Sequence, residues 1–183
     1  DMKLMKFAIL SFIFILVSCT DKEIELKYIA QEEQIENYIT SKFDTLTPIT
    51  RNNGSNRITI AQSKEVLDTV TGVIPTVNVL ERGDSIKFSY AGYIFNGGPQ
   101  TLFYTNNPEI SKFYGDTIPK SLHYGFDDLI IGLEYGLEGI KDGEEAIIVF
   151  SGKYGFQNEP MYSVPAASPL LFHIWVRDIK KNK

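Results

Sequence analysis

The stretch Leu129–Glu144, LIIGLEYGLEGIKDGE, decides how this chain folds. Within it, Ile130, Leu133 and Leu137 recur at the spacing of one helix face. Gly139 follows where a C-terminal helix cap is expected. We therefore predict one short helix in the second half of the chain, ended by this glycine.

Four glycines, at positions 132, 136, 139 and 143, interrupt the same stretch. A glycine inside a helix costs about 1 kcal/mol relative to alanine, so their number needs a specific reason. The run GLEYGLEG has some likeness to a phosphate loop, but such a loop follows an apolar strand and opens a helix, often with a lysine beside it. None of these features is present, and we do not expect nucleotide binding.

Outward from the helix, apolar residues alternate with other residues at the two-residue period of a strand. The alternating positions are Ile58 and Ile60; Ile86, Phe88 and Tyr90; Ala146, Ile148 and Phe150; and Leu170, Phe172, Ile174 and Val176. The segment 70–80 is β-branched but interrupted by Gly72 and Pro75, which fits an edge strand or a loop. The pattern predicts an α+β fold, mostly antiparallel sheet with one short helix late in the order.

The segment Asp21–Phe43 has apolar residues at helical spacing: Ile24, Tyr28, Ile35, Tyr38 and Ile39. Thr45–Asn56 is rich in turn-forming residues and is predicted to be a linker or loop, with a turn at Asn53-Gly54. Trp175 would lie on the face of the sheet opposite Phe172. We expect the N-terminal helix, or the segment after it, to pack over Trp175; the alternative is a free stalk or a dimerisation element.

The N-terminus resembles a bacterial lipoprotein leader. Lys3 and Lys6 precede the uncharged run Phe7–Val17, and its eleven residues are too few for the roughly 20 that span a bilayer. Leu16-Val17-Ser18-Cys19 is similar to a lipobox, in which the cysteine receives a lipid and the chain is cleaved ahead of it. We predict an envelope protein, lipid-anchored through Cys19 on the outer-membrane or periplasmic side.

Composition excludes several other classes. The net charge of −5 argues against nucleic-acid binding, which needs a basic patch. One cysteine allows no disulfide within the chain. His123 and His173 form no metal motif of familiar spacing. We expect no cofactor and no metal.

Four blocks, in order, resemble the FKBP-type prolyl isomerases. They are GDSIKFSYAGYI at 83–94, LIIGLEYGLEGIKDGE at 129–144, Tyr154-Gly155, and VPAASPLLF at 164–172. The resemblance covers about residues 57–180 and implies an FKBP-like antiparallel sheet wrapped around a short helix, with an N-terminal helical extension. It divides the chain into a leader (1–18), a lipidated helix and linker (19–56), and an FKBP-like domain (57–183).

The resemblance implies isomerisation of X-Pro bonds in proline-containing polypeptides, without nucleophile or cofactor. It carries a pocket onto Tyr90, Phe103, Leu129, Ile130, Leu133, Tyr154, Val164 and Phe172. The Ile130 N–H would hold the substrate carbonyl, Leu133 would form the floor, and Tyr154 would offer a hydroxyl.

Two positions depart from the family pattern. Leu133 replaces the usual tryptophan of the floor, and Tyr104 replaces the usual acidic residue after the wall phenylalanine. The sequence therefore leaves two functions open: a lipid-anchored isomerase or folding factor for exported polypeptides, and an inactive relative that binds peptides or scaffolds an envelope complex. A glycan-binding lipoprotein fits less well, because Trp175 is the only tryptophan.

Overall fold

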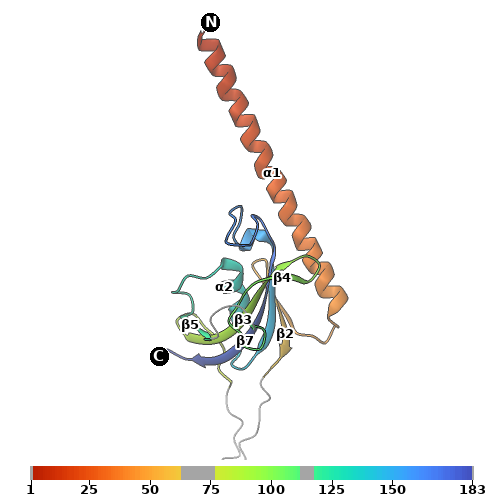
Figure 1. Cartoon of the computed structure of the whole chain (residues 1–183), viewed down its shortest axis with the longest axis vertical. Helices are drawn as coiled ribbons and strands as arrows, with labels where there is room; N and C mark the ends of the chain where they lie inside the picture. The colour runs from red at the N-terminus through yellow and green to blue at the C-terminus, as the bar shows by residue number, and fades with distance from the viewer. Residues whose placement is uncertain (1, 63–76, 112–117, 183) are drawn as a thin grey trace, which may run out of the picture.

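The computed structural model describes residues 2–62, 77–111 and 118–182. Two α-helices, a short 3-10 helix and seven strands lie within these ranges (Figure 1). In chain order they are α1 (Met2–Lys42), β1 (Ile49–Asn52), β2 (Ser55–Ala61), β3 (Ser85–Phe95), β4 (Pro99–Thr105), β5 (Lys120–His123), α2 (Ile131–Leu137), β6 (Glu145–Phe150), η1 (Gly152–Tyr154) and β7 (Leu170–Lys180).

The strands form one antiparallel sheet in the order β1-β2-β6-β7-β3-β4. The long strand β3 pairs with β7 on one side, with Tyr90 opposite Ile174. On its other side β3 pairs with β5 and then with β4. The sheet curves around α2 (Figure 1), as the family resemblance implied, so the predicted α+β fold, an antiparallel sheet around a short helix with an N-terminal helix before it, is confirmed.

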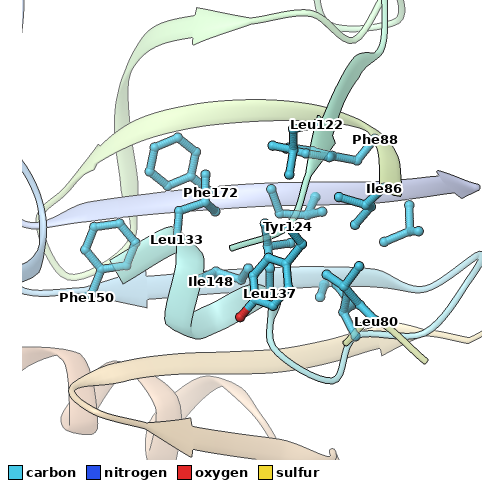
Figure 2. Packing of buried hydrophobic residues seen from close by; sticks show 14 of the residues in the cluster. Leu80, Ile86, Phe88, Leu122, Tyr124, Leu133, Leu137, Ile148, Phe150 and Phe172 are labelled. Atoms are coloured by element: carbon cyan, nitrogen blue, oxygen red, sulfur yellow. The ribbon is translucent and has the colours of Figure 1, made fainter. Parts of the chain in front are cut away.

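The main core lies between α2 and the concave face of the sheet. Leu133 and Leu137 of α2 join a buried cluster with Ile148, Phe150 and Phe172 (Figure 2). The helix glycines allow this close packing, because a Cβ on Gly132 would lie 2.4 Å from the Phe150 ring and one on Gly136 would lie 2.3 Å from Ile148. Gly139 follows the helix end with a φ of +70°, as expected for a C-terminal cap.

The back face of the sheet is partly covered by α1, whose C-terminal part lies against the domain (Figure 1). Ile35, Tyr38 and Ile39 are buried in a second cluster with Phe95, Val149 and Leu171. The predicted helical stripe therefore does pack on the sheet. Trp175 is absent from this cluster, so the prediction that the helix itself covers Trp175 is wrong. Trp175 is half-buried and stacks on His173, with 3.9 Å between the ring centroids.

The predicted linker over residues 45–56 is also wrong in part, because it contains β1 and the first residues of β2. These strands form a two-residue hairpin in which Asn52 pairs with Ser55. Asn53 (φ 46°) and Gly54 (φ +83°) have the positive φ values of a type I′ turn, so the turn itself was correctly predicted. The chain thus enters the sheet at Ile49.

Residues 70–80 were predicted to form an edge strand or a loop. Residues 70–76 lie outside the described ranges, and Val79 makes an isolated antiparallel bridge with Lys141. In the part of the chain that the structure describes, no helix has the length and apolar character needed to cross a membrane.

Candidate functional site

A largely apolar cavity of about 610 Å³ opens between the end of α2, strands β3 and β4, and the loop that follows β6. Seven of the eight predicted site residues line it: Tyr90, Phe103, Leu129, Ile130, Leu133, Val164 and Phe172. Seven further residues that the sequence analysis did not place in the site line it too: Phe88, Tyr104, Lys120, Asp128, Phe156, Met161 and Tyr162.

The lining has two parts that come from different elements. We call Leu129, Ile130 and Leu133 the α2 wall, because they lead into or belong to that helix. We call Phe156, Met161, Tyr162 and Val164 the loop wall, because they come from the segment between η1 and β7.

The base of the cavity is a group of packed aromatic rings around Phe172. Phe150 stacks on Phe172 with 5.9 Å between centroids, and Phe103 meets it edge-on at 5.8 Å. Tyr90 lies 6.1 Å from the same ring. These separations are those of favourable aromatic pairs, so the base is a rigid apolar surface.

Phe103 and Tyr104 are consecutive residues of β4, yet both line the cavity. Neighbouring side chains of a regular strand point to opposite faces. Here the pairing with β3 is irregular: Tyr104 pairs with Gly92 and Leu102 pairs with Tyr93, which leaves Phe103 as an extra residue. This bulge turns both rings toward the cavity, as bulges beside functional sites commonly do.

Tyr90 is held in place through its backbone. Its N–H donates to Asn106 Oδ1 at 2.6 Å, and its carbonyl accepts from Thr105 Oγ1 at 2.8 Å. Burial, and secondarily the neighbouring Tyr104, raises the pKa of Tyr90 to about 12. Tyr104 stacks on it at 5.5 Å and remains 41% exposed. The Tyr90 hydroxyl is therefore a neutral hydrogen-bonding group in the neutral pH range.

The predicted role of Tyr154 does not fit the structure. Tyr154 does not line the cavity, and its ring lies over the hairpin turn, where a Cβ on Gly54 would be 2.1 Å away from it. Two other aromatic side chains of this loop line the cavity instead: Phe156, which has no hydroxyl, and Tyr162, which is fully exposed. Tyr154 and Phe156 are only two residues apart in the sequence, and the 3-10 turn at Gly152–Tyr154 determines which of the two side chains points into the cavity.

The α2 wall presents a polar backbone group at Ile130. Ile130 has extended backbone angles (φ −60°, ψ 129°), and its carbonyl accepts hydrogen bonds from the N–H groups of Leu133 and Glu134. Among the described residues, no group accepts a hydrogen bond from the Ile130 N–H. This N–H is thus available at the cavity lining for a ligand carbonyl.

The α2 wall is fixed from behind by the β1–β2 hairpin. Arg57 Nη1 donates to the carbonyls of Gly136 (2.9 Å) and Glu138 (2.6 Å), and Ser55 Oγ donates to that of Gly132 (2.7 Å). The two Arg57 bonds satisfy carbonyls at the C-terminal end of the helix, which otherwise lack partners, and the Ser55 bond holds its first turn. The buried Arg57 also faces the buried Glu144, with 3.5 Å between Nε and Oε1.

The chemistry of this lining suits a binding pocket for an apolar group. Lys120 and Asp128 are its charged members, and neither histidine lies in it. Within the described ranges, no cluster of three or more His, Cys, Asp or Glu side chains is placed to hold a metal ion.

Known proteins share this architecture. Residues 77–177, more than half of the chain, match the sequence profile described as FKBP-type peptidyl-prolyl cis-trans isomerase. No curated protein sequence matches this one.

Three solved structures have similar folds. Peptidyl-prolyl cis-trans isomerase from Pseudomonas syringae has a TM-score of 0.59 at 13% identity, covering 86% of this chain and 96% of that one. FkpA from Escherichia coli gives 0.58 at 16%, covering 96% and 71%. The three FKBP domains of wheat FKBP73 give 0.55 at 15%, covering 74% of this chain and only half of the wheat chain. The structural likeness shows the fold, and the profile match shows that this chain belongs to the FKBP-type peptidyl-prolyl cis-trans isomerase family.

Proposed function

We propose that this protein is a lipid-anchored peptidyl-prolyl isomerase that acts on exported polypeptides at the cell envelope. The observation that carries the isomerase part is the aromatic cavity itself, which combines an apolar base around Phe172 with a free N–H at Ile130.

The cavity supplies what this reaction needs. Rotation about an X-Pro bond meets a barrier of about 18–20 kcal/mol that comes from amide resonance. The planar amide is more polar than the twisted transition state, so an apolar cavity disfavours the planar form more than the twisted one. The Ile130 N–H would hold the carbonyl while the proline ring sits against Phe172 and Leu133.

The competing proposal is a peptide-binding protein without catalysis. Two features favour it: Leu133 at the floor and Tyr104 in place of an acidic residue. Binding of proline peptides is common to both proposals, so only a rate measurement separates them.

The test measures the rate of cis–trans isomerisation of a proline-containing peptide with the unmodified protein and with variants at two adjacent positions of β4. Phe103→Ala removes a cavity ring, whereas the control Leu102→Ala truncates a half-buried neighbour that does not line the cavity. We expect Phe103→Ala to lower kcat/KM by about tenfold, the size of one lost aromatic contact plus its buried area, and Leu102→Ala to leave it nearly unchanged. No acceleration by the unmodified protein, or equal losses in both variants, would contradict the isomerase proposal.

The anchoring proposal rests on the tetrad Leu16–Cys19 after an uncharged run. Cys19→Ser should abolish labelling by a fatty-acid analogue and move the protein from the membrane fraction to the soluble fraction. Cys19→Ser protein that remains labelled in the membrane pellet would refute lipidation at this residue.

A further inference from the structure

The four residues of the loop wall belong to one closed loop whose two ends are in contact. Gly152 at its start and Ala167 at its end are so close that a Cβ on Gly152 would lie 2.6 Å from the Ala167 carbonyl carbon. Ala167 has a φ of +54°, which is uncommon for a residue other than glycine. The contact between Gly152 and Ala167, which we call the loop neck, therefore needs support from its surroundings.

The loop's own backbone supplies part of that support, because the Gln157 N–H donates to the Gly152 carbonyl and the Ala167 N–H donates to the Gln157 carbonyl. The other part comes from one side chain of α1. Gln31 Nε2 donates to the Ala167 carbonyl at 2.7 Å, and the Gly152 N–H donates to Gln31 Oε1 at 2.8 Å. Gln31 is 7% exposed, so both bonds are shielded from water. The Gln31 amide thus joins the two ends of the loop. Its N–H meets the carbonyl of Ala167, and its oxygen meets the N–H of Gly152.

Two other contacts between α1 and this loop are exposed: Lys153 pairs with Glu25 at 3.1 Å while both side chains remain about half exposed, and Lys27 Nζ donates to the Ala166 carbonyl at 3.5 Å. A third is partly buried, since the buried Ser151 Oγ donates to Glu32. Exposed ion pairs of this kind contribute little to stability. Gln31 is the α1 residue whose loss would leave buried backbone groups of the neck without partners.

We infer that Gln31 is a positioning residue for the cavity, and that α1 thereby sets the affinity of the site for its peptide. This inference rests on the proposed isomerase function. Val164 lies three residues before Ala167, and Phe156 lies four residues after Gly152, so a loosened neck displaces side chains of the loop wall. A wall that is only partly in place lowers the population of binding-competent protein and so raises KM without changing kcat.

The first test uses Gln31→Leu, which keeps the volume of the side chain but neither bond. Gln34→Leu is the matched control, because Gln34 lies one turn away on α1 and donates instead to Asn96, outside the cavity. On full-length protein extracted in mild detergent, we expect Gln31→Leu to raise KM at least about threefold with kcat unchanged, because two buried hydrogen bonds are lost. Gln34→Leu should match the unmodified protein.

Methyl NMR makes the test independent of catalysis. In Gln31→Leu, the methyl signals of Met161 and Val164 should shift or broaden, while those of Leu129 and Ile130 on the α2 wall stay in place. General destabilisation would not separate the two walls in this way. If the loop-wall signals move but no protein accelerates isomerisation, the positioning role of Gln31 is supported and the proposed isomerase function is refuted.

A second variant covers the possibility that Gln31→Leu does not fold. In Gln31→Glu, the protonated carboxyl can still donate to the Ala167 carbonyl, whereas the carboxylate repels it. Burial raises the pKa of the new carboxyl above its usual value near 4.3. KM should therefore equal that of the unmodified protein at low pH and rise as the pH increases through that pKa.

The charged groups nearest this contact, Lys27, Glu32 and Lys153, are present in both proteins, so the difference between their pH profiles isolates the new carboxyl. Gln34→Glu should show no such profile. Unchanged KM and unchanged loop-wall methyl signals in both Gln31 variants would overturn the inference.

Discussion

The two walls of the cavity are held by different means. The α2 wall is fixed by Arg57, a buried cation that binds helix carbonyls and faces Glu144. The loop wall is fixed by Gln31, a neutral amide on a separate helix. Both supports precede residue 77, where the family match begins. The chain's own N-terminal part therefore supports the family site from outside it.

The chemical difference implies different consequences of failure. A buried ion that loses its partner is strongly destabilising, because the remaining charge stays in a poorly solvated place. The loss of a neutral hydrogen bond lowers the free energy of unfolding by less, and its structural effect is local. We therefore expect damage to the α2 wall support to unfold the domain, and damage to the loop wall support to change its affinity.

The largest effect should come from Arg57→Leu. It leaves Glu144 buried without its cation and removes the donor to the α2 carbonyls, so we expect the free energy of unfolding to fall by about 3–5 kcal/mol. Arg51→Leu is the control, because Arg51 pairs with Glu36 at 2.7 Å with both side chains about half exposed, and such pairs contribute about 0–1 kcal/mol. Urea unfolding of both variants measures the difference, and equal losses would show that the buried pair has no special role.

A smaller loss is expected when α1 is loosened from the back face. Ile35 is 2% exposed, and Ile35→Ala should cost about 2 kcal/mol, the low end for such a truncation, because the helix can settle into the gap. Ile29→Ala, at a position 53% exposed on the same helix, should cost little. Trp175 emission before unfolding should stay unchanged, because α1 does not cover this residue; a red shift would place the helix nearer to it.

Activity can be raised by one added group on either wall. Leu133→Trp adds ring surface to the α2 wall, and Phe156→Tyr adds a hydroxyl at position 156 of the loop wall. Each should raise kcat/KM by about threefold, the scale of one aromatic contact or one hydrogen bond. A gain on one wall alone would identify the wall that limits catalysis, and no gain on either would favour the binding protein without catalysis.

The smallest effect concerns pH. Because burial raises the pKa of Tyr90 to about 12, its neutral form persists far above neutrality and its hydroxyl does not titrate between about pH 6 and 8. The isomerisation rate should therefore be nearly constant across that range, whichever wall is altered among the variants above. A bell-shaped profile centred near neutrality would reveal a titrating group that the cavity geometry does not suggest.

Periodic segments could be predicted from the sequence because their burial follows a simple period. The helix stripe of Ile130, Leu133 and Leu137 and the strand alternation around Phe172 both appear where the sequence indicated. The cavity residues on these elements were predicted from the family resemblance, and the regular backbone explains why that prediction placed them correctly. Regular structure fixes where their side chains point.

The errors fall where direction is set by irregular backbone. Tyr104 enters the cavity through a bulge, and Phe156 replaces Tyr154 there because of a single 3-10 turn. Strand β1 is short and has polar residues, although its Asn-Gly turn was a usable hairpin signal. Gln31 was overlooked as a polar residue, yet it lies three residues after Tyr28 and four before Ile35, within the buried stripe.

The unbroken run of α1 from Met2 to Lys42 bears on where the protein can work. Tyr28 is the first buried residue of α1 from residue 22 onward, and it lies nine positions after Cys19. At about 1.5 Å per residue, the helix between them is about 14 Å long. With a lipid on Cys19, a flexible tether would allow a wide range of distances between the cavity and the membrane surface, whereas a helical segment would keep that distance nearly constant. Such a protein would meet polypeptide segments as they pass close to the membrane surface, and would miss those already released beyond it.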